Sequence, residues 1–270
     1  MMVFPASSAF SSDAGWDTIA RGAAGYGWKI LLTFALLALG QAPQVWAGSF
    51  SINPVRIQLS PSATSEVLHV TNSGKTDVTV QLHPMQWTQQ EGEDQLKATR
   101  DLIVTPQIFN LKAGSSQIIR IGLARKNDSA SEVSYRLIIE EIPSSPEPGF
   151  QGLRLALRIS LPVFVKPTGQ VDQSLEARVV PRSTPTSEQI TLELVNTGRV
   201  HVQLHNLKIH TADTQEELLA TLEKNIYLLA GQKKRITLKA KNAILSSDVL
   251  LIRAETSNGK LELHAKSASP

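Results

Sequence analysis

The chain has 270 residues, with 27 Lys and Arg against 24 Asp and Glu, no cysteine, 41% hydrophobic residues and 5% aromatic residues. This length accommodates one large domain or two of ordinary size. The lack of cysteine excludes a disulfide scaffold, a thiolate zinc site and a cysteine nucleophile. The formal net charge of +3 is too small for a generic nucleic-acid-binding protein, so we expect no nucleic-acid partner.

The N-terminal segment has the pattern of an export signal. Lys29 precedes an apolar run over 30–40, and Val45-Trp46-Ala47 follows it. These features are typical of a secretory signal peptide over 1–47, cleaved after Ala47. The alternative is a transmembrane anchor, but the apolar run is too short to cross roughly 30 Å of hydrocarbon. The part before Trp28 is long for such a signal, and a translation start further downstream stays open. We expect no membrane insertion of the mature chain.

After residue 47 the sequence predicts strands throughout, because short apolar or alternating runs recur about every ten residues between turn residues. In chain order the first runs are SINPVRIQLS, EVLHVTNSGKTDVTVQLHPMQW, SSQIIRIGLA, SYRLIIEEIP and LRLALRISLPVFV. After Lys166 and Pro167 follow SLEARVV, QITLELVNTG, VHVQLHNLKIH, KNIYLLAG, KKRITLKA and DVLLIRAE. Asn72-Ser73-Gly74-Lys75 is predicted as a hairpin or a tight-turn linker, and 214–222 is a short helical candidate that could instead be a loop turn. The pattern favours all-β antiparallel sandwiches.

Two sandwich domains are predicted, over 48–166 and 167–270, because the strand rhythm restarts after Lys166-Pro167. The motif Val70-Thr71-Asn72-Ser73-Gly74 in the first is echoed by Val195-Asn196-Thr197-Gly198 in the second. Both motifs precede a run of alternating Val and Leu. The echo indicates one topology used twice. Chance similarity between two turns is the alternative.

Motifs of catalysis or metal binding are missing from the sequence, which has no Gly-rich phosphate loop, G-x-S-x-G elbow or HExxH. On one strand His201 and His205 share a face while His210 points away, so we interpret them as surface or packing residues rather than metal ligands. Glu140 and Glu141 are adjacent and face opposite sides of a strand, which excludes an acid–base pair. We expect no enzyme activity, no cofactor and no metal.

The segment 152–167, GLRLALRISLPVFVKP, is the most informative part of the sequence. Four large aliphatic side chains recur with period two and therefore project from one face of one strand: Leu153, Leu155, Leu157 and Ile159. An ordinary strand whose apolar face meets its own core is the alternative. The predicted strand, however, has about fourteen residues against a usual five or six, and it follows a Pro/Ser/Gly loop. A long open edge with large aliphatics is an aggregation hazard unless it binds a partner.

Three motifs in this order resemble the periplasmic pilus chaperones of the chaperone–usher system. They are NPVR in the first strand after the signal, YRLIIEEIP before the Pro-rich loop, and the strand that ends LPVFVKP. The LPVFV ending and the AGQKKR turn look most similar to the archaic, spore-coat-type branch. The resemblance implies two immunoglobulin-like domains set as an L. It also implies a periplasmic protein that binds pilin subunits by donor-strand complementation and delivers them to an outer-membrane usher.

The resemblance also implies roles for particular residues. It assigns the four aliphatics to the open groove of a pilin, and Arg56 in NPVR to the pilin's terminal carboxylate. Arg56 as a solvent-exposed strand residue is the alternative. Better-known members carry a lysine near the end of the lent strand, where this chain has Pro162. The second anchor is therefore open between Arg158, Lys166 and Arg120.

An interdomain ion pair is also implied, and it maps to Glu141 and Lys166, with Asp248 as a looser third candidate. Simple surface charge is the alternative for these residues. A dimer in which the free chaperone caps itself is left open. The competing function is a secreted β-sandwich adhesin or a pilus structural subunit. A structural subunit would carry its alternating donor segment at the N-terminus, whereas here the alternating strand ends the first domain.

Overall fold

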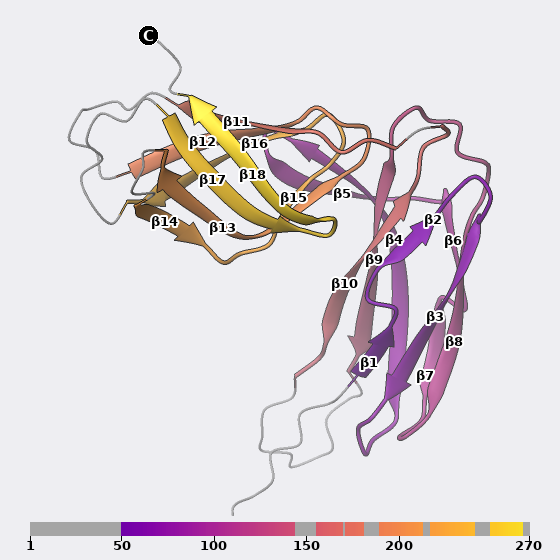
Figure 1. Ribbon diagram of the computed structural model, residues 1–270. Helices are drawn as coiled ribbons and strands as arrows, with labels where there is room; N and C mark the ends of the chain where they lie inside the picture. Colours follow the sequence, from indigo (N-terminus) through magenta and orange to yellow (C-terminus); the bar gives the residue numbers. More distant parts are fainter. Residues whose placement is uncertain are drawn as a thin grey trace, which may run out of the picture. The chain divides into compact units, whose positions relative to one another are not determined.

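The computed structural model describes residues 50–143, 155–169, 171–180, 189–212, 217–240 and 249–266. Every regular element in these ranges is a β-strand (Figure 1). Residues 47–270 form one compact unit, and the predicted signal peptide 1–47 falls outside the described residues. Within these ranges no helix is long and apolar enough to span a bilayer.

The first sandwich contains ten strands. They are β1 (Phe50–Asn53), β2 (Ile57–Leu59), β3 (Ser65–Asn72), β4 (Val78–Gln90), β5 (Glu93–Ala98), β6 (Leu102–Thr105), β7 (Ile108–Leu111), β8 (Ser116–Leu123), β9 (Val133–Ile142) and β10 (Arg158–Val165). One sheet has the order β1-β3-β8-β6, and the other β2-β10-β9-β4-β5, with β7 also paired to β4. Alternate residues of both sheets, such as Leu68, Ile121, Leu137 and Val163, fill one shared core.

The second sandwich contains eight strands. They are β11 (Leu175–Val180), β12 (Gln189–Asn196), β13 (Val202–Thr211), β14 (Leu218–Leu222), β15 (Ile226–Leu228), β16 (Lys233–Lys239), β17 (Val249–Thr256) and β18 (Gly259–Lys266). Its sheets have the orders β11-β12-β16 and β14-β13-β17-β18, and β15 also pairs with β13. Residues such as Leu192, Ile209 and Ile252 form a separate core. The predicted boundary at 166/167 falls in the connection between β10 and β11.

The echoed motif forms the same turn in both sandwiches. In the first, the buried Asn72 side chain donates from Nδ2 to the carbonyls of Thr76 (2.8 Å) and Leu111 (3.1 Å). Its Oδ1 accepts the Gly74 N–H (2.9 Å). The turn joins β3 in one sheet to β4 in the other, so it is a tight-turn linker and the hairpin interpretation is wrong.

In the second sandwich, Asn196 occupies the equivalent place. Its Nδ2 donates to the carbonyls of Val200 (2.8 Å), Leu228 (3.0 Å) and Leu229 (3.0 Å), and its Oδ1 accepts the Gly198 N–H (3.0 Å). Each asparagine thus satisfies the carbonyls of its own turn and of a neighbouring strand. The sequence echo is a structural repeat rather than a chance similarity of two turns.

Two predicted elements differ from the structure. The helical candidate 214–222 is wrong, because Leu218–Leu222 is strand β14, which pairs with β13 and buries Leu219 and Ala220. The run SINPVRIQLS is two strands, since β1 pairs with β3 in one sheet and β2 with β10 in the other. The apolar runs of the sequence also did not predict strands β5, β6, β7 and β18. All six residues of β5 are exposed, so that strand has no alternating pattern to detect.

Candidate functional site

Strand β10 has a partner along its whole length on one side only. β9 pairs antiparallel with all of Arg158–Val165, whereas β2 runs parallel to residues 163–165 alone. Among the described residues, no strand covers the other edge of residues 158–162. We call this stretch the open edge of β10. It can accept one further strand, because its backbone groups lack a ladder partner there.

The hydrogen bonds at the two ends of β10 show which backbone groups face the open edge. The Glu141 N–H donates to the Leu157 carbonyl (2.9 Å) on the β9 side, and the Lys166 N–H donates to the Leu59 carbonyl (2.9 Å) on the β2 side. Backbone groups alternate between the two sides of a strand, so Arg158 and Ser160 each present an N–H and a C=O to the open edge. Pro162 presents a carbonyl only.

The predicted row of aliphatics runs from solvent into the core. Leu155 is 70% exposed and Leu157 is half-buried, whereas Ile159 already packs against the first core. Leu153 lies outside the described residues. The regular strand has eight residues rather than about fourteen, and residues 155–157 precede it. Leu155 and Leu157 therefore extend the core-facing side of β10 beyond the protein's own core.

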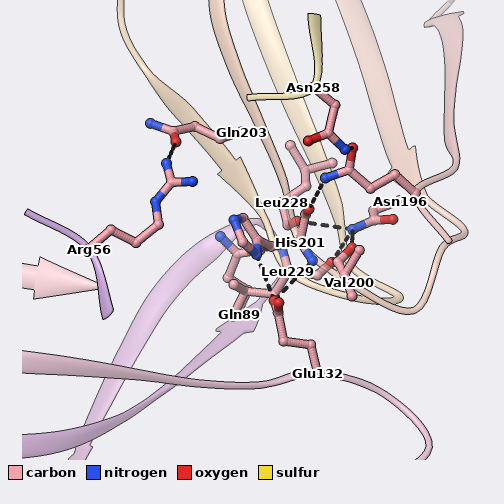
Figure 2. Close-up of polar contacts among 11 residues, drawn as sticks. Arg56, Gln89, Glu132, Asn196, Val200, His201, Gln203, Leu228, Leu229 and Asn258 are labelled. Carbon is pink, nitrogen blue, oxygen red and sulfur yellow. Dashed lines mark hydrogen bonds and ion pairs between the residues drawn. The ribbon is translucent and has the colours of Figure 1, made fainter. Parts of the chain in front are cut away.

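Arg56 lies at the end of the open edge. It sits between β1 and β2, where the chain crosses from one sheet to the other, rather than within a strand. Because the next residue, Ile57, pairs with Val163, Arg56 comes level with Pro162. Its Nη2 donates to Oε1 of the buried Gln203 on β13 (Figure 2). The guanidinium is half-buried and is held by the second sandwich.

None of the three candidates for a second anchor comes level with Arg56. Arg158 and Lys166 are each four residues from Pro162 along the chain, which is about 13 Å of extended strand. Arg120 is exposed on β8, and that strand belongs to the opposite sheet. The residue across from Pro162 on β9 is Arg136, which the sequence did not single out.

The predicted ion pair between Glu141 and Lys166 does not form. The antiparallel register places Glu141 beside Leu157, before the start of β10, and Lys166 beyond its opposite end. Instead, Oε2 of Glu141 accepts the Leu157 N–H (3.2 Å) and holds the entry to β10 in place. Asp248 lies outside the described residues.

A buried side-chain contact between the sandwiches joins Glu132 and His201. Oε1 of Glu132 lies 2.7 Å from His201 Nδ1 and accepts the His201 backbone N–H at 3.0 Å (Figure 2). Both side chains are buried, and the imidazole stacks on Phe164 with ring centroids 3.6 Å apart. The interpretation of His201 as a packing residue fits this position. Glu132 was missed, since it is 69 residues away in sequence.

A second contact between the sandwiches is built around Gln89. Its Nε2 donates to the Tyr227 carbonyl (2.8 Å) and its Oε1 accepts the Leu229 N–H (3.0 Å). On the same face of β4, Trp87 makes an edge contact with the Tyr227 ring, and the Arg136 guanidinium lies 3.7 Å above the Trp87 ring centroid. Burial lowers the pKa of Arg136 from its ordinary value. The cation remains charged at neutral pH.

The chemistry of this site is that of binding. The open edge offers backbone hydrogen bonds, Leu155 and Leu157 offer apolar contact area, and Arg56 offers a guanidinium suited to a carboxylate. Over the described ranges, no group of three or more acidic or histidine side chains could hold a metal ion.

Residues 49–170 match the family model described as "Pili and flagellar-assembly chaperone, PapD N-terminal domain". A search of curated proteins found no match. The chain is similar in fold to several solved structures. One is a chaperone–tip subunit pre-assembly complex, CsuC–CsuE, from the archaic Csu pili of Acinetobacter baumannii. It is 21% identical, covers 82% of this chain and 100% of that chain, and has a TM-score of 0.62.

Two further structures have the same fold. A complex of the Salmonella enterica SafA pilin with the SafB chaperone is 17% identical, covering 82% of this chain and 98% of that one with a TM-score of 0.56. The Escherichia coli chaperone DraB is 16% identical, covering 82% and 97% with a TM-score of 0.53. At these identities the likeness establishes the two-sandwich fold.

Proposed function

We propose that this chain is a pilus-assembly chaperone of the family whose model matches residues 49–170, and that it lends strand β10 to pilin subunits and delivers them to an outer-membrane usher. The observation that carries the proposal is the open edge of β10, which is flanked by Leu155 and Leu157 and ends at Arg56. The solved complexes of similar fold, in which chaperones hold a tip subunit or a pilin, support it.

The site sets the direction of the strand that it accepts. A subunit chain whose terminal carboxylate meets Arg56 must end beside Pro162. Its preceding residues then lie beside Ser160 and Arg158, so it runs parallel to β10. This is also the direction of β2, which continues the same edge beyond Arg56. The subunit therefore occupies the place that a longer β2 would take.

Two kinds of interaction hold the subunit. The Arg158 and Ser160 backbone groups bond to any extended chain, whatever its side chains. Leu155 and Leu157 enter the groove left by the subunit's missing strand, and each fully buried aliphatic contributes roughly 1.5–3 kcal/mol. An arginine fork binds a carboxylate through two parallel N–H bonds, so Arg56 favours the free end of a chain over an internal loop.

The proposed route places the mature chain in the periplasm. The segment 1–47 acts as the export signal, and the mature protein begins at Gly48. Before a subunit arrives, the apolar extension at Leu155 is exposed, so two free copies cap each other through their open edges. The archaic, spore-coat-type branch remains our assignment within the family.

The test is subunit recovery with variants on the two faces of the lent strand. Leu155→Arg places a charge in the subunit's apolar groove, and we expect at least a tenfold loss of subunit co-purified from the periplasm. The control Arg158→Ala, on the opposite face, should keep subunit recovery. Both variants should unfold at the wild-type midpoint. A lowered unfolding midpoint for Leu155→Arg would show that Leu155 packs in the protein's own core. That result would contradict strand donation.

A further inference from the structure

Two polar side chains at the start of β13 are buried although they face away from the second core. Val202 and Leu204 belong to that core, so the alternating residues His201 and Gln203 face the opposite way. Both are nevertheless only 5% exposed. His201 contacts Glu132 of the first sandwich, and Gln203 contacts Arg56 (Figure 2). The first sandwich thus covers this face of β13.

We infer that Gln203 is a positioning residue, which holds the Arg56 guanidinium in place for the terminal carboxylate of a subunit. This inference rests on the proposed function. A free arginine side chain samples many rotamers, and part of this entropy is lost whenever the guanidinium binds. Gln203 is itself fixed by burial, so its hydrogen bond orders Arg56 before any subunit arrives.

The neutral amide is essential to this role. A guanidinium has five N–H donors, and Gln203 accepts one of them. Among the described residues no other acceptor bonds to Arg56, so its other donors make no hydrogen bond within this part of the chain. An amide oxygen has no net charge and leaves the positive charge of Arg56 available to a carboxylate. A glutamate at the same place would neutralise Arg56 and compete with the subunit's carboxylate.

The experiment compares two peptides on the purified full-length mature protein. Both are nonapeptides that alternate valine with serine and carry a fluorescein label at the N-terminus, one with a free C-terminal carboxylate and the other amidated. For the wild type, the acid should bind about tenfold more tightly than the amide by fluorescence anisotropy, as expected for a charge-assisted contact. Arg56→Ala should lose this preference.

Gln203→Glu should reduce the acid-to-amide ratio of affinities to about one, without changing the affinity for the amide or the unfolding midpoint. Gln203→Leu, of similar size, should lower the ratio several-fold. Gln95→Glu adds the same charge at an exposed residue of β5 and should keep the wild-type ratio.

Each outcome identifies what has failed. If wild-type protein binds both peptides equally, the proposed carboxylate contact at Arg56 is wrong. If the wild type prefers the acid and Gln203→Glu keeps that preference, the inference about Gln203 is overturned. It is also overturned if the Gln203 variants weaken both peptides equally, because that would show a structural role.

Discussion

The last strand of each sandwich occupies the same place, β10 beside β9 and β18 beside β17, yet the two strands are built differently. β17 and β18 are joined by a tight turn and pair along their full length, from Thr256 and Gly259 to Val249 and Lys266. β9 and β10 are separated by a long connection, and Leu155 and Leu157 extend beyond the first core. One last strand closes its sandwich, whereas the other leaves apolar surface exposed at its start.

The outward side chains show the same difference. β18 carries exposed Lys260, Glu262, His264 and Lys266 on its outer face, while its inner residues pack on the second core. Charges of this kind prevent an edge strand from pairing with another chain. β10 carries one charge, Arg158, on its outer face, and its core-facing side continues into the exposed Leu155. Because both sandwiches have the same repeated fold, a feature that both last strands share is one that the fold requires. A feature of β10 alone is a candidate for a role in binding.

The sharpest test of this comparison is an arginine at an inward-facing apolar position of β18. Leu263 is half-buried and packs on the second core, so Leu263→Arg should destabilise the protein by about 3 kcal/mol. Leu155→Arg should change the free energy of unfolding by less than about 0.5 kcal/mol. Chemical denaturation of both variants measures this. Equal losses would mean that β10 is an ordinary closing strand.

The repeated asparagine turn gives the next largest effect. Asn196→Ala removes the side-chain donor from the buried carbonyls of Val200 and Leu228, while the Leu229 carbonyl keeps the Gln232 N–H. Asn72→Ala does so for one buried carbonyl, that of Leu111, and for the exposed Thr76. Each unsatisfied buried group costs about 1 kcal/mol or more, so we expect losses of about 2.5 and 1.5 kcal/mol. Urea unfolding curves would resolve the two. A larger loss for Asn72→Ala would show that the two turns do not contribute in the same way.

Much of the fold could be predicted from the sequence, because most strands of both sandwiches alternate clearly between polar and apolar residues. The echo of the motifs around Asn72 and Asn196 also identified the repeat. The split of SINPVRIQLS could not be foreseen, since its apolar pattern continues across a change of sheet. Strand β14 was predicted as a short helix or a loop turn, because short apolar runs such as Leu218–Leu222 fit either period.

The sequence could indicate site residues through local spacing but not contacts that depend on register. Spacing predicted the aliphatic row and the family resemblance predicted Arg56, and both stay predictions as subunit-binding residues. The predicted Glu141–Lys166 pair was wrong because Glu141 lies near the end of β9, whereas Lys166 follows the end of β10. In an antiparallel pair of strands these two positions lie at opposite ends of the ladder. Gln203 carries no local signal, since its contact with Arg56 spans 147 residues of sequence. Such contacts follow from tertiary packing alone.

The smallest expected effect concerns how the two hairpins are held at their loop ends. In β17–β18 the backbone pairing reaches the turn, whereas Leu157 at the entry to β10 gives its N–H to the Glu141 carboxylate. Glu141→Ala should therefore speed hydrogen exchange of the Leu157 amide about tenfold, since one charge-assisted hydrogen bond is lost. Exchange at Leu161, within the β9–β10 ladder, should not change, and the global free energy of unfolding should fall by less than about 1 kcal/mol. Unchanged exchange at Leu157 would show that the backbone ladder alone fixes the start of β10. Faster exchange at both amides would show that Glu141 supports the whole hairpin, and the two last strands would then differ less than their sequences indicate.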